Sequence, residues 1–390
     1  MQSCSRKFYL FLTFHCFLLG LFPFFLPVFL FKQGGDLATI SWFIAITGLG
    51  FVVTLYLFDH TRAKSATLPI VCSFLLEGGL LALLLGDAPM PVIALVNGGY
   101  SCLYWTIQRV LFFANGSSED SGRRFGNFQI YVFIVLKVGV FFGSLLLENV
   151  GIWAIALLSL LVGGIGIRLL TGDVAGLDFP LVMQQQKVLT FSDITRFRDN
   201  CNSRLVFMLD GIFLYLESYF WLITLFLVVG ENFFRLGLLV IVLAVGLSII
   251  FYLLKNGIDR MDGNRLYMSA VVFYIASWAL RASFDSELNY SLQISMLLVI
   301  SFCTSFFRLA FNKRFFDIAE KSFHYHYLFM KSYYSQLFLV LGFGFAGVCF
   351  FATEIGMGAM LKGSYWVGAI IAGLYFCYRP AEISLKEMID

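Results

Sequence analysis

The sequence predicts an all-α membrane protein whose twelve transmembrane helices form two pseudo-symmetric six-helix bundles. Three observations favour this fold class. Hydrophobic residues make up 59% of the 390 residues and charged residues only 13%, which is about half of the ~25% charged share of soluble domains. The apolar residues gather in segments long enough to cross a bilayer. Matching polar residues recur about half a chain apart, which indicates an internal repeat.

Short polar stretches separate twelve apolar segments of about 20 residues, the length that a transmembrane helix needs. The first segment exceeds the apolar core of a signal peptide, so we expect a retained helix. Pro23 and Pro27 predict a kink near its end, because each removes a backbone hydrogen-bond donor. The segments are Phe8 to Phe31, Ile40 to Phe58, Leu68 to Gly86, Met90 to Ala114, Phe128 to Leu147, Val150 to Leu170, Arg204 to Gly230, Leu236 to Leu254, Leu266 to Phe284, Ser291 to Phe311, Tyr327 to Ala352 and Ser364 to Tyr378.

The longest polar stretch, Thr171 to Ser203, separates six segments from six. We therefore expect an N-terminal six-helix bundle over residues 1–170, a central cytoplasmic loop over 171–203 and a C-terminal six-helix bundle over 204–390. Within the loop, the residues from Phe191 to Asn202 have the pattern of a short amphipathic helix.

Lysine and arginine are divided unequally between the two sides of the predicted membrane. With the N-terminus inside, twenty lie in inner segments and four in outer ones, while Arg109, Lys137 and Lys331 fall within spans. Cytoplasmic loops carry the excess of basic residues, so both termini are predicted to be cytoplasmic. Short loops without pairs of external cysteines favour a bacterial inner membrane.

Two pairs of residues support the internal repeat. Asp59 follows the second segment and Asp259 follows the eighth, 200 residues later. Arg109 lies near the inner end of the fourth segment and Arg308 near the inner end of the tenth, 199 residues later. The nearly identical offset predicts that the two halves are duplicated.

The loops that contain these aspartates resemble those of the major facilitator superfamily. Leu55 to Lys64 keeps Asp59 and the basic Arg62 of the family pattern G-x-x-x-D-R-x-G-R-R, without its glycines, and the second loop keeps Asp259-Arg260. The resemblance covers essentially the whole chain. It implies that these loop residues gate transport and that helices one, four, seven and ten line a central cavity.

Arg109, Arg308 and Asp210 are ionisable residues placed within predicted spans, about 8 Å from the cytoplasmic boundary at 1.5 Å per residue. A charge inside a membrane marks a functional site or a buried pair. If the three meet in the cavity, two cations face one anion, which suits an anionic substrate. The alternative is that both arginines extend to the interface or tie loops together.

Glu217 and Lys137 lie near the centres of the seventh and fifth segments. A carboxylate in mid-membrane can carry a proton, because burial disfavours its charged form. We therefore predict that these two residues couple transport to protons. The alternatives are a static pair of Lys137 with Glu217, or of Lys137 with Glu77. His15 can join a proton relay, although a lone histidine on an apolar helix is usually only hydrogen-bonded.

Aromatic and amide side chains accompany these charges, and they can stack on the ring of a flat organic acid or bond to it. The alternative is that they serve helix packing, since aromatic residues make up 18% of the chain. The predicted substrate-binding residues of this kind are Tyr104, Trp105 and Gln108 on the fourth segment and Tyr215 on the seventh.

Several functional classes are excluded by the sequence. A net charge of +3 without a basic cluster argues against nucleic-acid binding. The sequence has no HExxH, GxSxG or P-loop motif, so we predict neither an enzyme nor direct use of ATP. The cysteine and histidine spacings match no metal site, and no cofactor is expected.

We predict a secondary active transporter that acts as a monomer in the bilayer and moves a small organic, anionic solute by alternating access, coupled to protons. Two alternatives stay open. The first is a flippase or exporter of an amphipathic anion, such as a lipid precursor or siderophore. The second is a membrane sensor that has lost transport.

Overall fold

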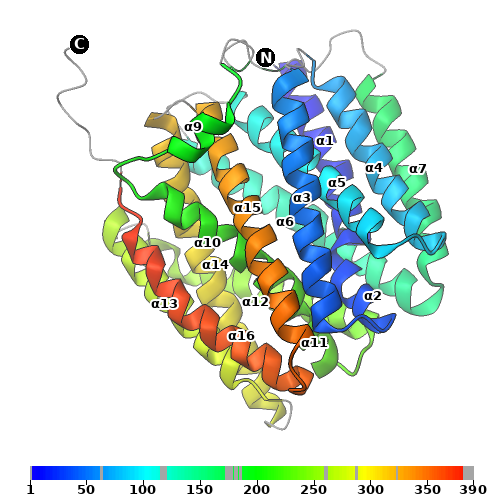
Figure 1. The fold of residues 1–390 in the computed structure, drawn as a ribbon, viewed down its shortest axis with the longest axis vertical. Helices are drawn as coiled ribbons and strands as arrows, with labels where there is room; N and C mark the ends of the chain where they lie inside the picture. Colours follow the sequence, from blue (N-terminus) through cyan, green and yellow to red (C-terminus); the bar gives the residue numbers. More distant parts are fainter. Residues whose placement is uncertain are drawn as a thin grey trace. The chain divides into compact units, whose positions relative to one another are not determined.

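The computed structural model describes residues 2–61, 65–114, 121–171, 179, 183, 187–258, 262–285, 289–321 and 324–380. Helices joined by short turns make up almost all of this described part (Figure 1). Eleven helical stretches within it are long and apolar enough to cross a membrane. The fourth predicted segment forms the 25-residue helix α5 (Met90–Ala114). The chain is therefore an all-α integral membrane protein, as predicted.

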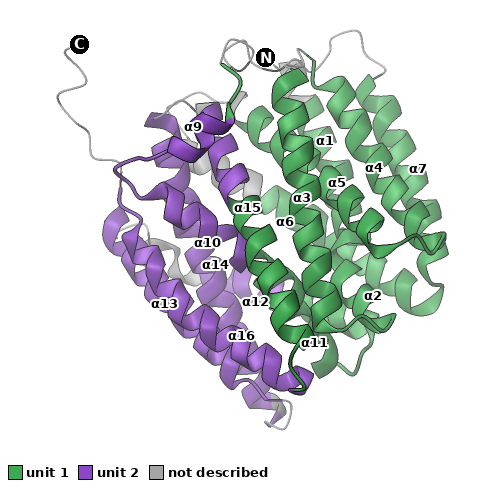
Figure 2. Cartoon of the chain, viewed as in Figure 1, with its two compact units in different colours: residues 1–190, 214–241, 335–354 green, residues 191–213, 242–334, 355–390 purple. Residues whose placement is uncertain are grey.

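The helices form two compact units, shown in green and purple in Figure 2. Unit 1 holds residues 1–190, 214–241 and 335–354, and unit 2 holds residues 191–213, 242–334 and 355–390. The division into bundles over residues 1–170 and 204–390 stays a prediction. The helices of residues 1–190 are α1 (Gln2–Leu21), α2 (Leu26–Lys32), α3 (Leu37–Thr61), α4 (Thr67–Leu85), α5, α6 (Ser121–Asn149) and α7 (Ile152–Thr171).

The second part of the chain supplies the remaining helices. The helices α12 and α15 contribute residues to both units. The elements are α9 (Phe191–Arg196), α10 (Ser203–Tyr215), the π-helix η3 (Leu216–Phe220), α11 (Trp221–Val228), α12 (Phe233–Ile258), α13 (Gly263–Ser283), α14 (Tyr290–Lys321), α15 (His324–Phe351), α16 (Met357–Ala372) and the 3-10 helix η4 (Gly373–Cys377).

The first membrane segment is interrupted where the prolines predicted a kink. The helix α1 ends at Leu21, the 3-10 turn η1 (Pro23–Phe25) follows, and α2 then begins at Leu26. Pro27 stands in the first turn of α2, where a missing backbone N–H costs little. The kink is therefore confirmed, and it comes from the absent donors.

Glycines allow α1 and α6 to approach closely within unit 1. A Cβ atom on Gly139 would clash with the backbone of Phe17 and Gly20, and one on Gly143 would clash with the backbone of Leu21. The two α6 glycines are four residues apart and so lie on one face of the helix. This is the small-residue packing that brings membrane helices into contact without a hydrophobic driving force.

Polar residues at helix starts satisfy the first backbone N–H groups. The side chain of Asp262 accepts hydrogen bonds from the backbone of Asn264 (3.1 Å) and Arg265 (3.2 Å), which caps α13. At the start of α3, hydrogen bonds from the side chain and backbone of Thr39 hold the pKa of Asp36 below its usual value. Both carboxylates lie at the N-terminal end of a helix, where the helix dipole stabilises a negative charge.

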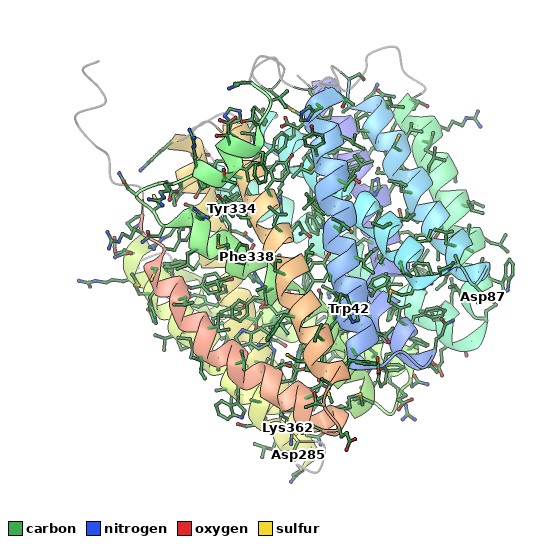
Figure 3. All side chains as sticks on the ribbon, in the orientation of Figure 1. Trp42, Asp87, Asp285, Tyr334, Phe338 and Lys362 are labelled. Atoms are coloured by element: carbon green, nitrogen blue, oxygen red, sulfur yellow. The ribbon has the colours of Figure 1, made fainter. Side chains whose placement is uncertain are left out.

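The short amphipathic helix expected in the central loop is α9, which ends at Arg196 rather than at Asn202. Its backbone is held by the rest of unit 2, because the Tyr334 hydroxyl donates to the carbonyl of Ile194. Elsewhere in unit 2, the exposed ion pair of Lys362 and Asp285 at 3.0 Å links α16 to the segment that follows α13 (Figure 3).

We expect Gly143→Leu to lower the stability of the purified protein in detergent by about 1–3 kcal/mol, the usual cost of overpacking. The added side chain would meet the backbone of Leu21, which has little room to move. The control is Gly164→Leu on α7, where an added Cβ meets nothing within 4 Å. Thermal unfolding should separate the two variants, and equal melting temperatures would contradict the close α1–α6 contact.

Candidate functional site

A buried carboxylate lies at the centre of the candidate site. Asp210 belongs to α10, and only 1% of its side chain is exposed. Taking a carboxylate out of water costs several kcal/mol unless opposite charges and hydrogen bonds replace the lost hydration. The residues that face Asp210 therefore decide whether its charge is tolerated.

Two cations from different helices of unit 2 meet this carboxylate. Arg308 on α14 donates from Nη1 to Oδ1 of Asp210 at 2.5 Å, and Lys331 on α15 places its Nζ 3.1 Å from Oδ2. Each carboxylate oxygen therefore has its own cation. We call Asp210, Arg308 and Lys331 the charged cluster.

The charged cluster carries one positive charge in excess when all three groups are ionised. Side-chain exposure is 7% for Lys331 and 19% for Arg308, so the excess charge is largely withdrawn from water. Arg308 is the most accessible of the three. An excess cation in this setting attracts an anion more strongly than the same charge in water, because the local dielectric constant is low.

Aromatic rings surround both cations. The Lys331 Nζ lies 4.4 Å from the ring centroid of Phe315 and 4.9 Å from that of Phe311. The Arg308 guanidinium carbon lies 5.8 Å from the ring centroid of Tyr274. Ring faces attract cations, most strongly where water is absent. These contacts offset part of the cost of burying the second cation.

The structure thus brings together two of the three charged residues proposed for substrate binding, Asp210 and Arg308. Sequence reasoning left Lys331 out of this set, although a lysine within a membrane span is itself a signal of function. The third residue, Arg109, belongs to unit 1, and its meeting with Asp210 stays a prediction. Its guanidinium carbon lies 5.9 Å from the ring centroid of Trp105.

The aromatic and amide residues predicted on α5 have different surroundings. Trp105 is 38% exposed, whereas Tyr104 and Gln108 are buried. The Tyr104 hydroxyl lies 3.4 Å from the sulfur of Cys16. The Gln108 side-chain oxygen is buried without a hydrogen-bond partner in the part of the chain that the structure describes. Gln108 therefore keeps an acceptor that a ligand or water can use.

Tyr215 and Glu217 lie where the seventh span changes its helical winding. Tyr215 ends α10 and stacks on Tyr219 with ring centroids 5.2 Å apart. Glu217 belongs to the π-helix η3 and is half-buried. Short π-helical turns inside α-helices often accompany functional sites. A role for Glu217 in coupling remains a prediction.

Lys137 has aromatic rather than acidic neighbours. Its Nζ lies 5.3 Å from the ring centroid of Phe133 and 5.7 Å from that of Phe24. Among the described residues, no ion pair joins Lys137 to Glu217 or Glu77. The two static pairs considered from the sequence are therefore not formed in this structure, because Glu77 faces His15 instead.

Only one of the four predicted gating residues falls in the described structure. The Asp59 Oδ2 atom accepts a hydrogen bond from the backbone N–H of Leu189 at 3.0 Å. This contact ties the end of α3 to the segment before α9. Arg62, Asp259 and Arg260 lie outside the described residues.

Solved structures with similar folds are transporters. The chain matches a single-substitution mutant of the nucleoside transporter NupG with a TM-score of 0.68 and 14% identity, over 96% of this chain and 98% of that one. A second NupG structure gives 0.63 and 15% over 96% and 100%. The human organic anion transporter MFSD10 (TETRAN) gives 0.62 and 13% over 95% and 99%. No protein-family model and no curated sequence matches the chain.

We expect Asp210→Asn to lower the stability of the protein by about 3–5 kcal/mol, the usual cost of leaving a buried charge without its partner. Two buried cations would then face each other. The double variant Asp210→Asn/Lys331→Met removes one of them and should recover part of the loss. Thermal unfolding of the purified variants measures both effects, and an Asp210→Asn protein as stable as wild type would contradict the charge balance described above.

Proposed function

We propose that this chain, which has the fold of the major facilitator superfamily, is a secondary transporter of small organic anions. The observation that carries the proposal is that two cations, Arg308 and Lys331, lie beside the single carboxylate of Asp210. A structural ion pair needs only one cation for each carboxylate. The second cation adds a desolvation cost, and an anionic ligand would offset that cost.

The chemistry of the two cations suits a carboxylate ligand. The planar guanidinium of Arg308 offers several N–H donors in a fixed arrangement that matches a carboxylate or phosphate, whereas the Lys331 ammonium acts as a compact charge. Arg308 is also the more exposed of the two. We therefore propose that Arg308 contacts the substrate and that Lys331 sets the charge of the site.

The similar structures support transport and leave the substrate open. One is named an organic anion transporter and two are named nucleoside transporters. A nucleoside carries no charge at neutral pH, so it would make little use of an excess cation. The charged cluster therefore favours an anion.

The remaining predicted residues complete the proposal. The six-helix halves, residues 1–170 and 204–390, would rock about a central site. Arg109 would add a third cation, while Tyr104, Trp105, Gln108 and Tyr215 would hold the organic part of the substrate. The loops with Asp59 and Asp259 would gate access.

We expect wild-type protein to be stabilised against heat by benzoate and not by the isosteric, uncharged benzamide. The same comparison with nicotinate and nicotinamide, or succinate and succinamide, widens the range of shapes tested. Lys331→Met leaves Asp210 and Arg308 as a neutral pair. It should weaken anion binding about 10- to 100-fold, as expected if losing the attraction of a nearby cation costs about 1.5–3 kcal/mol.

The matched control is Lys362→Met, which removes an exposed lysine from its pair with Asp285. This variant should bind the anions like wild type. Stabilisation by the amides rather than the acids, or equal anion binding by Lys331→Met and wild type, would contradict the proposal.

We also expect Glu217→Gln to change the pH dependence of transport if Glu217 carries the coupled proton. Proteoliposomes that contain the protein are loaded with benzoate, and uptake of labelled benzoate is measured with and without an inward proton gradient. The predicted result is exchange that no longer responds to the gradient. A response equal to that of wild type would assign coupling to another group.

A further inference from the structure

A second buried polar cluster lies in unit 1. His15 on α1 is fully buried, and Glu77 on α4 is 2% exposed. The His15 Nδ1 and Glu77 Oε2 atoms are 3.9 Å apart. Neither these atoms nor Glu77 Oε1 has a hydrogen-bond partner among the described residues. Buried polar atoms are rarely left in this state.

The hydrogen bonds around Ser73 assign the proton of the histidine. The Ser73 hydroxyl donates to the carbonyl of Ile70 at 2.7 Å, so its oxygen is left to accept from His15 Nε2 at 2.8 Å. In the neutral ring, Nε2 therefore carries the hydrogen and Nδ1 carries the lone pair. This places a base opposite the Glu77 carboxyl group.

Within the described part of the chain, the surroundings of the pair are aromatic and contain no charged partner. The His15 ring stacks on Phe74 with centroids 4.0 Å apart and meets the edge of Phe11 at 4.7 Å. From α5, Tyr104 lies 5.2 Å and Tyr100 6.2 Å from the same ring. The Tyr100 hydroxyl lies close enough to Glu77 to act on it as a neutral hydrogen-bond donor, although the two groups fall outside strict hydrogen-bond geometry.

The ionisable groups on the other neighbouring elements have other contacts. Cys16, next to His15 on α1, faces Tyr104. On α6, Tyr131 bonds to Thr13 and Lys137 lies against phenylalanine rings. Arg168 is the one ionisable residue on α7 and ends that helix. Among the described residues, His15 is the basic side chain within ion-pair distance of Glu77.

Charge balance requires that the pair hold one shared proton in this structure. A deprotonated Glu77 beside a neutral His15 would be a buried anion without a partner, and a protonated pair would be a buried cation. The two neutral arrangements are a carboxylic acid beside a neutral imidazole, and a carboxylate beside an imidazolium. They differ by transfer of one proton from Glu77 Oε2 to His15 Nδ1.

We propose that His15 and Glu77 together form a second site, besides Glu217, that takes up and releases the coupled proton. The step breaks the Glu77 O–H bond and forms the His15 Nδ1–H bond, and a water molecule then takes the proton when the site opens to one side. The 3.9 Å gap must shorten for this transfer, as catalytic hydrogen bonds often do when a site closes. The coupling rests on the proposed transport function, whereas the shared proton does not.

The shared proton is tested without any substrate, by infrared spectroscopy of the purified protein across a pH series. Wild-type protein should show the carbonyl stretch of a protonated carboxyl group that is lost as pH rises. Glu77→Gln should lack that band. His15→Phe should keep the band to higher pH, because no base remains to accept the proton. The control Glu354→Gln changes an exposed glutamate in the same unit and should match wild type.

Coupling is tested in proteoliposomes by uptake of labelled benzoate driven by a pH gradient. We expect Glu77→Gln to lose the gradient-driven accumulation of benzoate and Glu354→Gln to keep it. Loss in Glu217→Gln with retention in Glu77→Gln would overturn it, as would a carboxyl band unchanged in Glu77→Gln. If wild-type protein neither binds nor transports the anions, the proposed function fails, and the infrared series still decides whether the pair shares a proton.

Discussion

The desolvation of charge is the constraint on which the rest of the structure depends. In a chain with so few charged residues, every ionisable group kept from water must find an opposite charge, a hydrogen bond or a ring face. Asp210 has two cations, Lys331 and Arg308 have rings as well as the carboxylate, and Lys137 has only rings. Each arrangement offsets the cost of burying charge, but the arrangements differ in net charge. We propose that this net charge determines what a site can bind.

The two polar clusters differ in net charge, and we propose a different role for each in transport. The charged cluster in unit 2 holds two cations beside one carboxylate, and under the proposed function the substrate's anionic group would join them. The pair of His15 and Glu77 in unit 1 is neutral with one proton and cannot gain or lose that proton cheaply while it stays buried. Packing leaves the His15 side chain little freedom, because its ring stacks on Phe74 and the backbones of α1 and α6 lie in close contact.

The fold was largely predictable from the sequence, and the sites were predictable only in part. Apolar length located the spans, and Pro23 located the break after α1, because both act locally. Intramembrane charge indicated Asp210 and Arg308 but did not reveal Lys331 as their partner. Pairing depends on which helix faces which, and one sequence does not contain that information. For the same reason Glu77 was considered as a partner of Lys137, whereas the structure places it beside His15.

We propose that Arg308 and Lys331 of the charged cluster receive the substrate's anionic group. A structure determined with 4-bromobenzoate tests it most directly, because the bromine can be located by its anomalous scattering. The account predicts that the carboxylate lies within hydrogen-bond distance of Arg308, next to Lys331, with the ring extending away from Asp210. A ligand bound elsewhere, with the three side chains unchanged, would show that the cluster is a structural ion pair and would contradict the account.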